Sequence, residues 1–97
     1  MSIRILASAS DDLNRGRIFY SRQGEGVGEY FLDSLASDID SLALYAGIHS
    51  KVYGYYRLLA KRFPYAVYYQ INRSQDVVVW RVLDLRQDPS RIERALK

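Results

Sequence analysis

The stretch from Tyr55 to Ile71 constrains the fold of this chain more than any other. It holds two runs rich in Tyr, Leu, Val and Ile, and these residue types suit a pleated, half-buried surface. The basic segment Lys61-Arg62-Phe63-Pro64 separates the two runs. Pro64 has no backbone N–H and therefore fits a turn or the first position of a strand. The stretch predicts a β-hairpin with one face in the core and the other bearing tyrosines and arginines.

Composition limits the class of protein. The chain has 97 residues, of which 48% are hydrophobic and 26% charged, and it has no cysteine. These values are typical of an ordinary globular protein without disulfides or zinc–sulfur sites. Because no apolar run is long enough for a membrane span and the N-terminus does not resemble a signal peptide, we expect one domain over residues 1–97 in the cytoplasm.

The residues before the hairpin follow helical spacing. A short strand is predicted over residues 3–7, followed by a helix that Ser8 caps and that ends at the glycine turn 23–26. A second, amphipathic helix is predicted from Val27 to Ala46, because its apolar residues recur at helical spacing. The two helices should form an antiparallel helical hairpin.

The residues after the hairpin complete an α+β fold of order β-α-α-β-β-β-α. A strand is predicted over Val77–Leu83, after a turn at residues 72–76. Asp88 caps a short C-terminal helix over Ser90–Leu96, with Pro89 at its first position. We expect a small, curved, largely antiparallel sheet packed on the helical hairpin.

Period-two alternation assigns the faces of the sheet. On the last strand, Val78, Trp80 and Val82 are predicted to face the helical hairpin. The opposite face should carry a polar set, with Arg86 just past the last strand. That set is Arg57, Lys61, Tyr68, Gln70 and Arg81. Such side chains can hold phosphates and stack on bases, or Tyr68 and Arg81 can instead support the terminal helix.

The charge distribution favours an acidic partner for the β-rich half. From Arg57 onward bases outnumber acids, whereas the segment from Glu25 to Asp40 has acids and no base. A basic surface attracts acidic partners but can also be merely solvated. The candidate residues for binding a target or a nucleic acid are Arg57, Lys61, Arg62, Arg73, Arg81 and Arg86.

Other constellations carry little chemistry. His49 is the single histidine, so a loop histidine is expected rather than a metal site. The glycines at 24, 26 and 28 join helix to helix, which does not fit a phosphate-binding loop. Asp84 is expected to pair with a nearby arginine. We expect no cofactor and no metal.

Two phrases, Arg62-Phe63-Pro64-Tyr65-Ala66-Val67-Tyr68-Tyr69 and Val82-Leu83-Asp84-Leu85-Arg86-Gln87-Asp88-Pro89, together with the order of elements, resemble the RelE/ParE superfamily of bacterial toxins. These are the toxins of type II toxin–antitoxin, or plasmid-stabilisation, modules. The resemblance implies a cytoplasmic bacterial protein that inhibits growth and forms a hetero-oligomer with an acidic or amphipathic antitoxin segment.

The two branches of this superfamily differ in their targets. The RelE branch is an mRNA interferase that cuts messenger RNA on the ribosome, whereas the ParE branch inhibits DNA gyrase. Arg57 and Arg86 match basic positions of the RelE branch. Ala66 and Ile92 stand roughly where that branch carries an arginine and a terminal tyrosine, and neither can donate or accept a proton.

The resemblance therefore favours a ParE-like toxin that binds an essential target such as DNA gyrase. A RelE-like, metal-independent endoribonuclease is the first alternative, with Tyr68 assisting as the base. Its catalytic residues would be Arg57, Lys61, Tyr68, Arg81 and Arg86. A toxin-derived binding module without toxicity is the second alternative.

Overall fold

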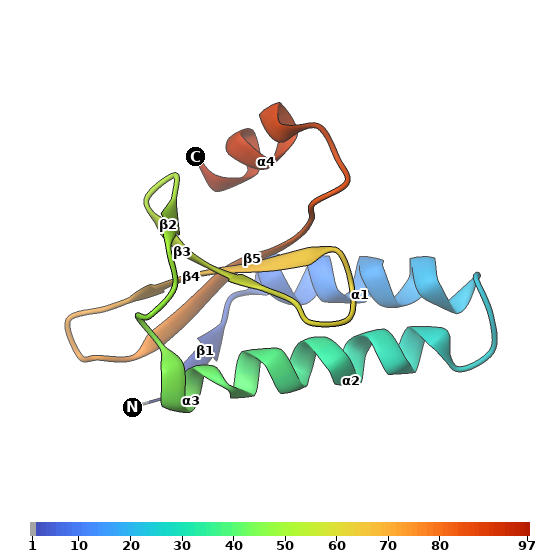
Figure 1. The fold of residues 1–97 in the computed structure, drawn as a ribbon, viewed down its shortest axis with the longest axis horizontal. Coiled ribbons are helices and arrows are strands. Elements are labelled where there is room, and N and C mark those ends of the chain that lie inside the picture. The colour runs from blue at the N-terminus through green and yellow to red at the C-terminus, as the bar shows by residue number, and fades with distance from the viewer. Residues whose placement is uncertain (1) are drawn as a thin grey trace.

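The computed structural model describes residues 2–97 and has three layers (Figure 1). The helical hairpin lies on one side of a twisted sheet, and the C-terminal helix lies on the other side. The elements are β1 (Ile3–Ile5), α1 (Ala7–Ser21), α2 (Val27–Asp40), α3 (Leu42–Tyr45), β2 (Lys51–Val52), β3 (Tyr55–Leu59), β4 (Tyr65–Ile71), β5 (Val77–Asp84) and α4 (Pro89–Leu96). The predicted α+β order is confirmed, and α3 and β2 are two short additions to it.

The sheet has five strands in the order β1-β5-β4-β3-β2. β1 pairs with β5 in parallel, and the other neighbours pair antiparallel. The predicted hairpin is formed by β3 and β4, whose register places Arg57 opposite Tyr68. Because β5 is the next strand, Arg81 lies opposite Tyr68 on its other side.

The predicted face assignment of β5 is wrong for Val78 and Trp80. The register shifts between Tyr68 and Tyr69, which pair with Arg81 and Val79, so Trp80 is an extra residue in a β-bulge. An extra residue moves every later side chain to the other face. As a result Val79 and Val82 are both buried in the core that packs on the helices, whereas Trp80 is 37% exposed.

Helix ends also differ from the prediction. Leu6, not Ser8, is the N-cap of α1, and no side chain caps that helix. The hydroxyl of Ser8 instead donates to the carbonyl oxygen of Trp80 at 2.8 Å and ties α1 to the bulge. The helix predicted to run from Val27 to Ala46 is interrupted at Ser41. The Asp88 cap is confirmed, because its side chain accepts from the backbone N–H of Ser90 at 3.0 Å.

The apolar residues form two clusters, one on each face of the sheet. The larger cluster joins α1, α2, β4 and β5, and Phe31, Leu35 and Val67 in it are fully buried. The smaller cluster lies between α4 and the opposite face, which we call the open face. Its buried members are Ala66, Tyr68, Leu83, Ile92 and Leu96. The terminal helix therefore covers part of the open face.

Gly28 is required where α2 crosses α1. A Cβ atom there would lie 2.6 Å from the carbonyl oxygen of Arg17 and would overlap the hydroxyl of Ser21. A backbone oxygen cannot move aside cheaply, so we expect Gly28→Ala to lower the free energy of unfolding by about 2 kcal/mol. Urea denaturation followed by circular dichroism measures this change. Ser37→Ala, at an exposed site of α2, should change it by less than about 0.5 kcal/mol; equal stability of the two variants would contradict the prediction.

A hydrogen-bonded histidine links the loop after α3 to the core. The hydroxyl of Tyr69 accepts from the backbone N–H of Gly47 at 2.9 Å and is also hydrogen bonded to Nδ1 of His49. Burial lowers the pKa of His49 from 6.5. The folded state thus disfavours the protonated ring. The contribution of His49 to the free energy of unfolding is therefore fully present above about pH 6.5, and it falls as the pH drops through the lowered folded-state pKa.

The predicted direction of the pH dependence can be tested with His49→Gln. Between about pH 7 and pH 5 the original chain should lose stability relative to the variant. The reason is that the histidine of the original chain binds a proton more readily in the unfolded state than in the partly buried folded site. Chemical denaturation at a series of pH values gives the difference between the two curves. A difference that is constant with pH would show that His49 does not titrate as described.

Candidate functional site

Arg57, Tyr68 and Arg81 form a row across three neighbouring strands of the open face. Cross-strand pairing joins Arg57 of β3 to Tyr68 of β4, and Tyr68 to Arg81 of β5. α4 lies over the same face and buries Tyr68 among Ile92 and Leu96. Part of the row, Tyr68 and Arg81, therefore supports the terminal helix.

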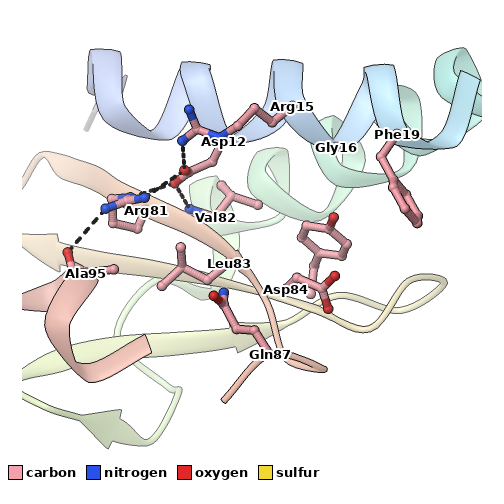
Figure 2. Close-up of a pocket in the computed structure, with 11 residues that line it drawn as sticks. Asp12, Arg15, Gly16, Phe19, Arg81, Val82, Leu83, Asp84, Gln87 and Ala95 are labelled. Atoms are coloured by element: carbon pink, nitrogen blue, oxygen red, sulfur yellow. Dashed lines mark hydrogen bonds and ion pairs between the residues drawn. The ribbon is translucent and has the colours of Figure 1, made fainter. Parts of the chain in front are cut away.

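Arg81 is bound to a carboxylate of α1. Its Nε donates to Oδ2 of Asp12 at 2.7 Å, and its Nη2 donates to Oδ1 at 2.9 Å (Figure 2). A third nitrogen, Nη1, donates to the carbonyl oxygen of Ala95 at 3.3 Å. The guanidinium thus joins α1, β5 and α4, and its bonds to Asp12 raise the pKa of Arg81 further above its usual value. Asp12 also binds Arg15, so one carboxylate balances two guanidinium groups.

The carboxylate of Asp12 is 6% exposed and has two further donors. The backbone N–H of Val82 donates to Oδ2 at 2.9 Å, and Nη2 of Arg15 donates to Oδ1 at 2.8 Å. A buried carboxylate with several donors is well compensated for its loss of water. Sequence reasoning missed Asp12, although an acid on the buried stripe of Ala9, Gly16 and Tyr20 was a signal for it.

Tyr68 is poorly suited to accept a proton. The residue is 1% exposed, and burial raises the pKa of its phenol above 10, although the nearby charge of Arg57 opposes part of this rise. A general base works best with a pKa near the working pH. The environment of Tyr68 therefore moves its pKa in the wrong direction for a base.

Arg86 lies beyond β5 and turns toward α1. Its Nε and Nη2 donate to the two carboxylate oxygens of Asp84 at 3.0 and 2.8 Å, which confirms the predicted pairing of Asp84 with an arginine. Nη2 also donates to the hydroxyl of Tyr20 at 3.2 Å, and the guanidinium lies 5.7 Å from the ring centre of Phe19. Arg86 thus lies on the α1 side of the sheet, away from Arg57.

The remaining predicted cations lie at two ends of the sheet. Lys61 and Arg62 are exposed in the turn between β3 and β4, near Arg86, because Pro64 accepts a backbone hydrogen bond from Leu85 at 2.8 Å. Arg73 is exposed in the turn between β4 and β5, at the far end. The seven residues of β4 separate the two ends by about 20 Å. The six candidate cations therefore do not form one cluster.

A groove runs between α1, β5 and the end of α4 (Figure 2). It encloses about 280 Å³. Its lining is Asp12, Arg15, Gly16, Phe19, Tyr65, Arg81, Val82, Leu83, Asp84, Gln87 and Ala95. Burial and the charge of Asp84 raise the pKa of Tyr65 there to about 12, so its phenol stays neutral. The groove offers the exposed side chain of Arg15 and the half-buried amide of Gln87, beside apolar side chains and the carboxylates of Asp12 and Asp84.

Residues 2–97 contain neither a cluster of metal-ligand side chains nor a helix that could span a membrane. In this range no three His, Cys, Asp or Glu side chains come together as metal ligands would. Likewise, none of the described helices has the length and apolar character needed to span a bilayer. Gly24 and Gly26 lie in the connection from α1 to α2, as expected, and Gly28 lies in the first turn of α2.

The fold and the site define a class of small α+β proteins: an open sheet face with arginines and a terminal helix, backed by a helical hairpin. A solved structure described as the chromosomal ParDE TA system from P. aeruginosa has this fold, with a TM-score of 0.79 and 19% sequence identity. The match covers 89% of this chain and 97% of that chain. No curated protein matches the chain significantly.

The family comparison gives a more specific result. The model of the ParE toxin of type II toxin-antitoxin system, parDE, matches residues 3–89. The chain belongs to this family and is a ParE-type toxin of a type II toxin–antitoxin system. The resemblance noted in the sequence is thereby confirmed, on the ParE side of the superfamily.

Proposed function

We propose that this toxin arrests bacterial growth in the cytoplasm by binding an essential target such as DNA gyrase, and that it does not cut RNA. Family membership is the observation that carries this proposal. A cognate antitoxin would neutralise the toxin by binding it in a hetero-oligomer. Residues 1–97 would act as one toxin domain.

The open face supports binding over catalysis. Cutting RNA requires a base for the 2′-hydroxyl, positive charge at the phosphate and an acid for the leaving oxygen. Ala66 and Ile92 stand roughly where toxins of the RelE branch carry an arginine and a tyrosine. Both are buried in the smaller apolar cluster, between the sheet and α4. Arg81 and Arg86 are already bound to carboxylates. Within residues 2–97 this leaves Arg57 as the arginine of the row without a carboxylate, which is less positive charge than a cleavage site needs.

Induction of the chain in bacteria tests the proposal. Cells should form filaments with damaged DNA, while messenger RNA stays intact on primer-extension analysis. Purified toxin should also inhibit supercoiling by purified gyrase. Prompt cleavage of transcripts would overturn the proposal in favour of an endoribonuclease, and harmless overexpression without any antitoxin would favour a module that has lost toxicity.

Tyr68→Phe separates binding from RNA cleavage. The substitution removes the phenolic hydroxyl, the one candidate base of the row, and keeps the buried ring, so the fold should be retained. We expect growth arrest to change by less than about twofold, whereas loss of a general base lowers a rate by about a hundredfold or more. Colony counts after induction measure the effect. Loss of arrest in a folded Tyr68→Phe chain would support the nuclease.

The groove of Figure 2 is the proposed seat of the antitoxin. Amphipathic segments commonly dock in apolar grooves, with charged residues at the rim. Phe19 is 45% exposed and lines the groove with Leu83. Arg15 and Arg81 share the single carboxylate of Asp12, which leaves a net positive charge for an acidic segment. Co-expression of a small acidic reading frame next to the toxin gene should restore growth. Phe19→Ala should weaken this rescue, whereas Leu44→Ala, at an exposed site of α3, should not.

A further inference from the structure

We propose that a cavity beside Arg57 is a binding site for a carboxylate carried on an apolar body. The cavity lies between β2, β3 and the start of α4 and encloses about 300 Å³. Its lining is Val52, Tyr53, Arg57, Tyr68, Leu85, Pro89 and Ile92. Cavities of this size and apolar character, with a few polar groups, are typical of small-ligand sites.

Arg57 differs from Arg81 and Arg86 in its partners. Arg81 is bound by Asp12 and Arg86 by Asp84, whereas Arg57 forms no ion pair within residues 2–97. The acids of the neighbouring helix are already engaged, since Glu93 binds Lys97 at 2.8 Å and Asp88 caps α4. A half-buried guanidinium against apolar walls gains from an anion that is brought to it.

The cavity fixes the geometry that such an anion would meet. Arg57 and the phenol of Tyr68 are direct cross-strand neighbours, and both groups line the cavity. The phenol can donate its hydrogen beside the guanidinium, because burial keeps it protonated. A planar carboxylate matches the two-pronged donor of an arginine, and one negative charge balances one guanidinium. The walls formed by Val52, Leu85 and Ile92 then suit an aliphatic or aromatic body.

The turn between β2 and β3 brings Tyr53 to the cavity. Val52 pairs with Tyr55, so Tyr53 and Gly54 are the two central residues of a tight hairpin, and their φ values of 55° and 85° are of the kind that such a turn requires. Tyr53 is 47% exposed and lines the cavity. The ring can cover the apolar body of a ligand whose carboxylate reaches Arg57.

Two sources offer this chemistry: a free small acid, or a Glu or Asp side chain next to an apolar residue in a partner protein. The site does not depend on gyrase being the target, because binding can be measured on the toxin alone. If the toxin fails to inhibit gyrase, the proposed function fails, but the cavity remains testable.

Titration of the ¹⁵N-labelled full chain followed by NMR tests the site. Hexanoate should shift the Nε–H signal of Arg57 and the amide signals of Tyr68 and Ile92, with a Kd on the order of a millimolar. Hexanamide has the same shape and no charge, and should bind about tenfold or more weakly. The blocked peptide Leu-Glu-Leu tests whether a side chain of a partner protein can bind, and Leu-Gln-Leu is its uncharged control. Binding of hexanoate alone indicates a free acid, and binding of the Glu peptide alone indicates a partner segment; either supports the site.

Variants complete the test. Arg57→Gln should weaken hexanoate binding by about tenfold or more, and Arg57→Lys should retain an intermediate affinity because it keeps the charge without the two-pronged donor. Arg91→Gln, at an exposed position of α4, is the matched control and should bind as the original chain does. The proposal is wrong if hexanoate and hexanamide bind equally, if neither anionic probe binds, or if Arg57→Gln, with an unchanged circular dichroism spectrum, keeps its affinity.

Discussion

Phe31→Ala is expected to lower the free energy of unfolding by about 4 kcal/mol. Phe31 is fully buried, and its ring centre lies 5.1, 5.0 and 4.9 Å from those of Tyr20, Phe63 and Tyr65. Removing the ring leaves a cavity that α1, α2 and the hairpin turn cannot fill together, because each is held by other contacts. Guanidinium denaturation followed by circular dichroism measures the loss.

The same substitution should act on function as well as stability. Phe63 belongs to the turn that carries Lys61 and Arg62, so loosening its ring contacts should also loosen those two cations. Leu44→Ala is the matched control, because Leu44 is 81% exposed and should change the stability by less than about 0.5 kcal/mol. A loss below about 1 kcal/mol for Phe31→Ala would mean that the ring is not the centre of the aromatic cluster.

Asp12→Asn is expected to lower the free energy of unfolding by about 3 kcal/mol, at the lower end for a broken buried ion pair. The amide group of asparagine is nearly isosteric, but it cannot accept from Arg81, Arg15 and Val82 as the carboxylate does. We take the lower end because the side chain of Arg81 is 24% exposed and can regain some water. Asp11→Asn, on the exposed side of α1, is the control.

A double-mutant cycle isolates the pair. Replacing Arg81 by Met in the Asp12→Asn chain should recover part of the lost stability, because the unpaired guanidinium is then gone. A purely additive result would show that Asp12 acts through Val82 and Arg15 rather than through Arg81. Since Arg81 also bonds to the carbonyl oxygen of Ala95, both variants should increase hydrogen exchange in α4.

Local patterns in the sequence were enough to predict the main elements and their order. Local signals sufficed for this: helical spacing in α1 and α2, alternating β-formers on either side of Pro64, and the Asp88-Pro89 start of α4. The short phrases around Tyr65 and Arg86 also indicated the family. These features depend on residues close together in the chain, so their physical cause is visible in the sequence.

Local patterns did not predict which side chains face one another, because that depends on contacts between distant parts of the chain. The bulge at Trp80 reversed the alternation of half of β5, because one extra residue in a strand is set by its pairing partner and not by its own pattern. Asp12 and Arg81 are 69 positions apart in the chain and form an ion pair. Of the two arginines in the row, Arg57 therefore lacks a carboxylate partner. Charge composition gave the cations, but long-range contacts determined which of them are neutralised, because an ion pair depends on distance in space and not in the chain.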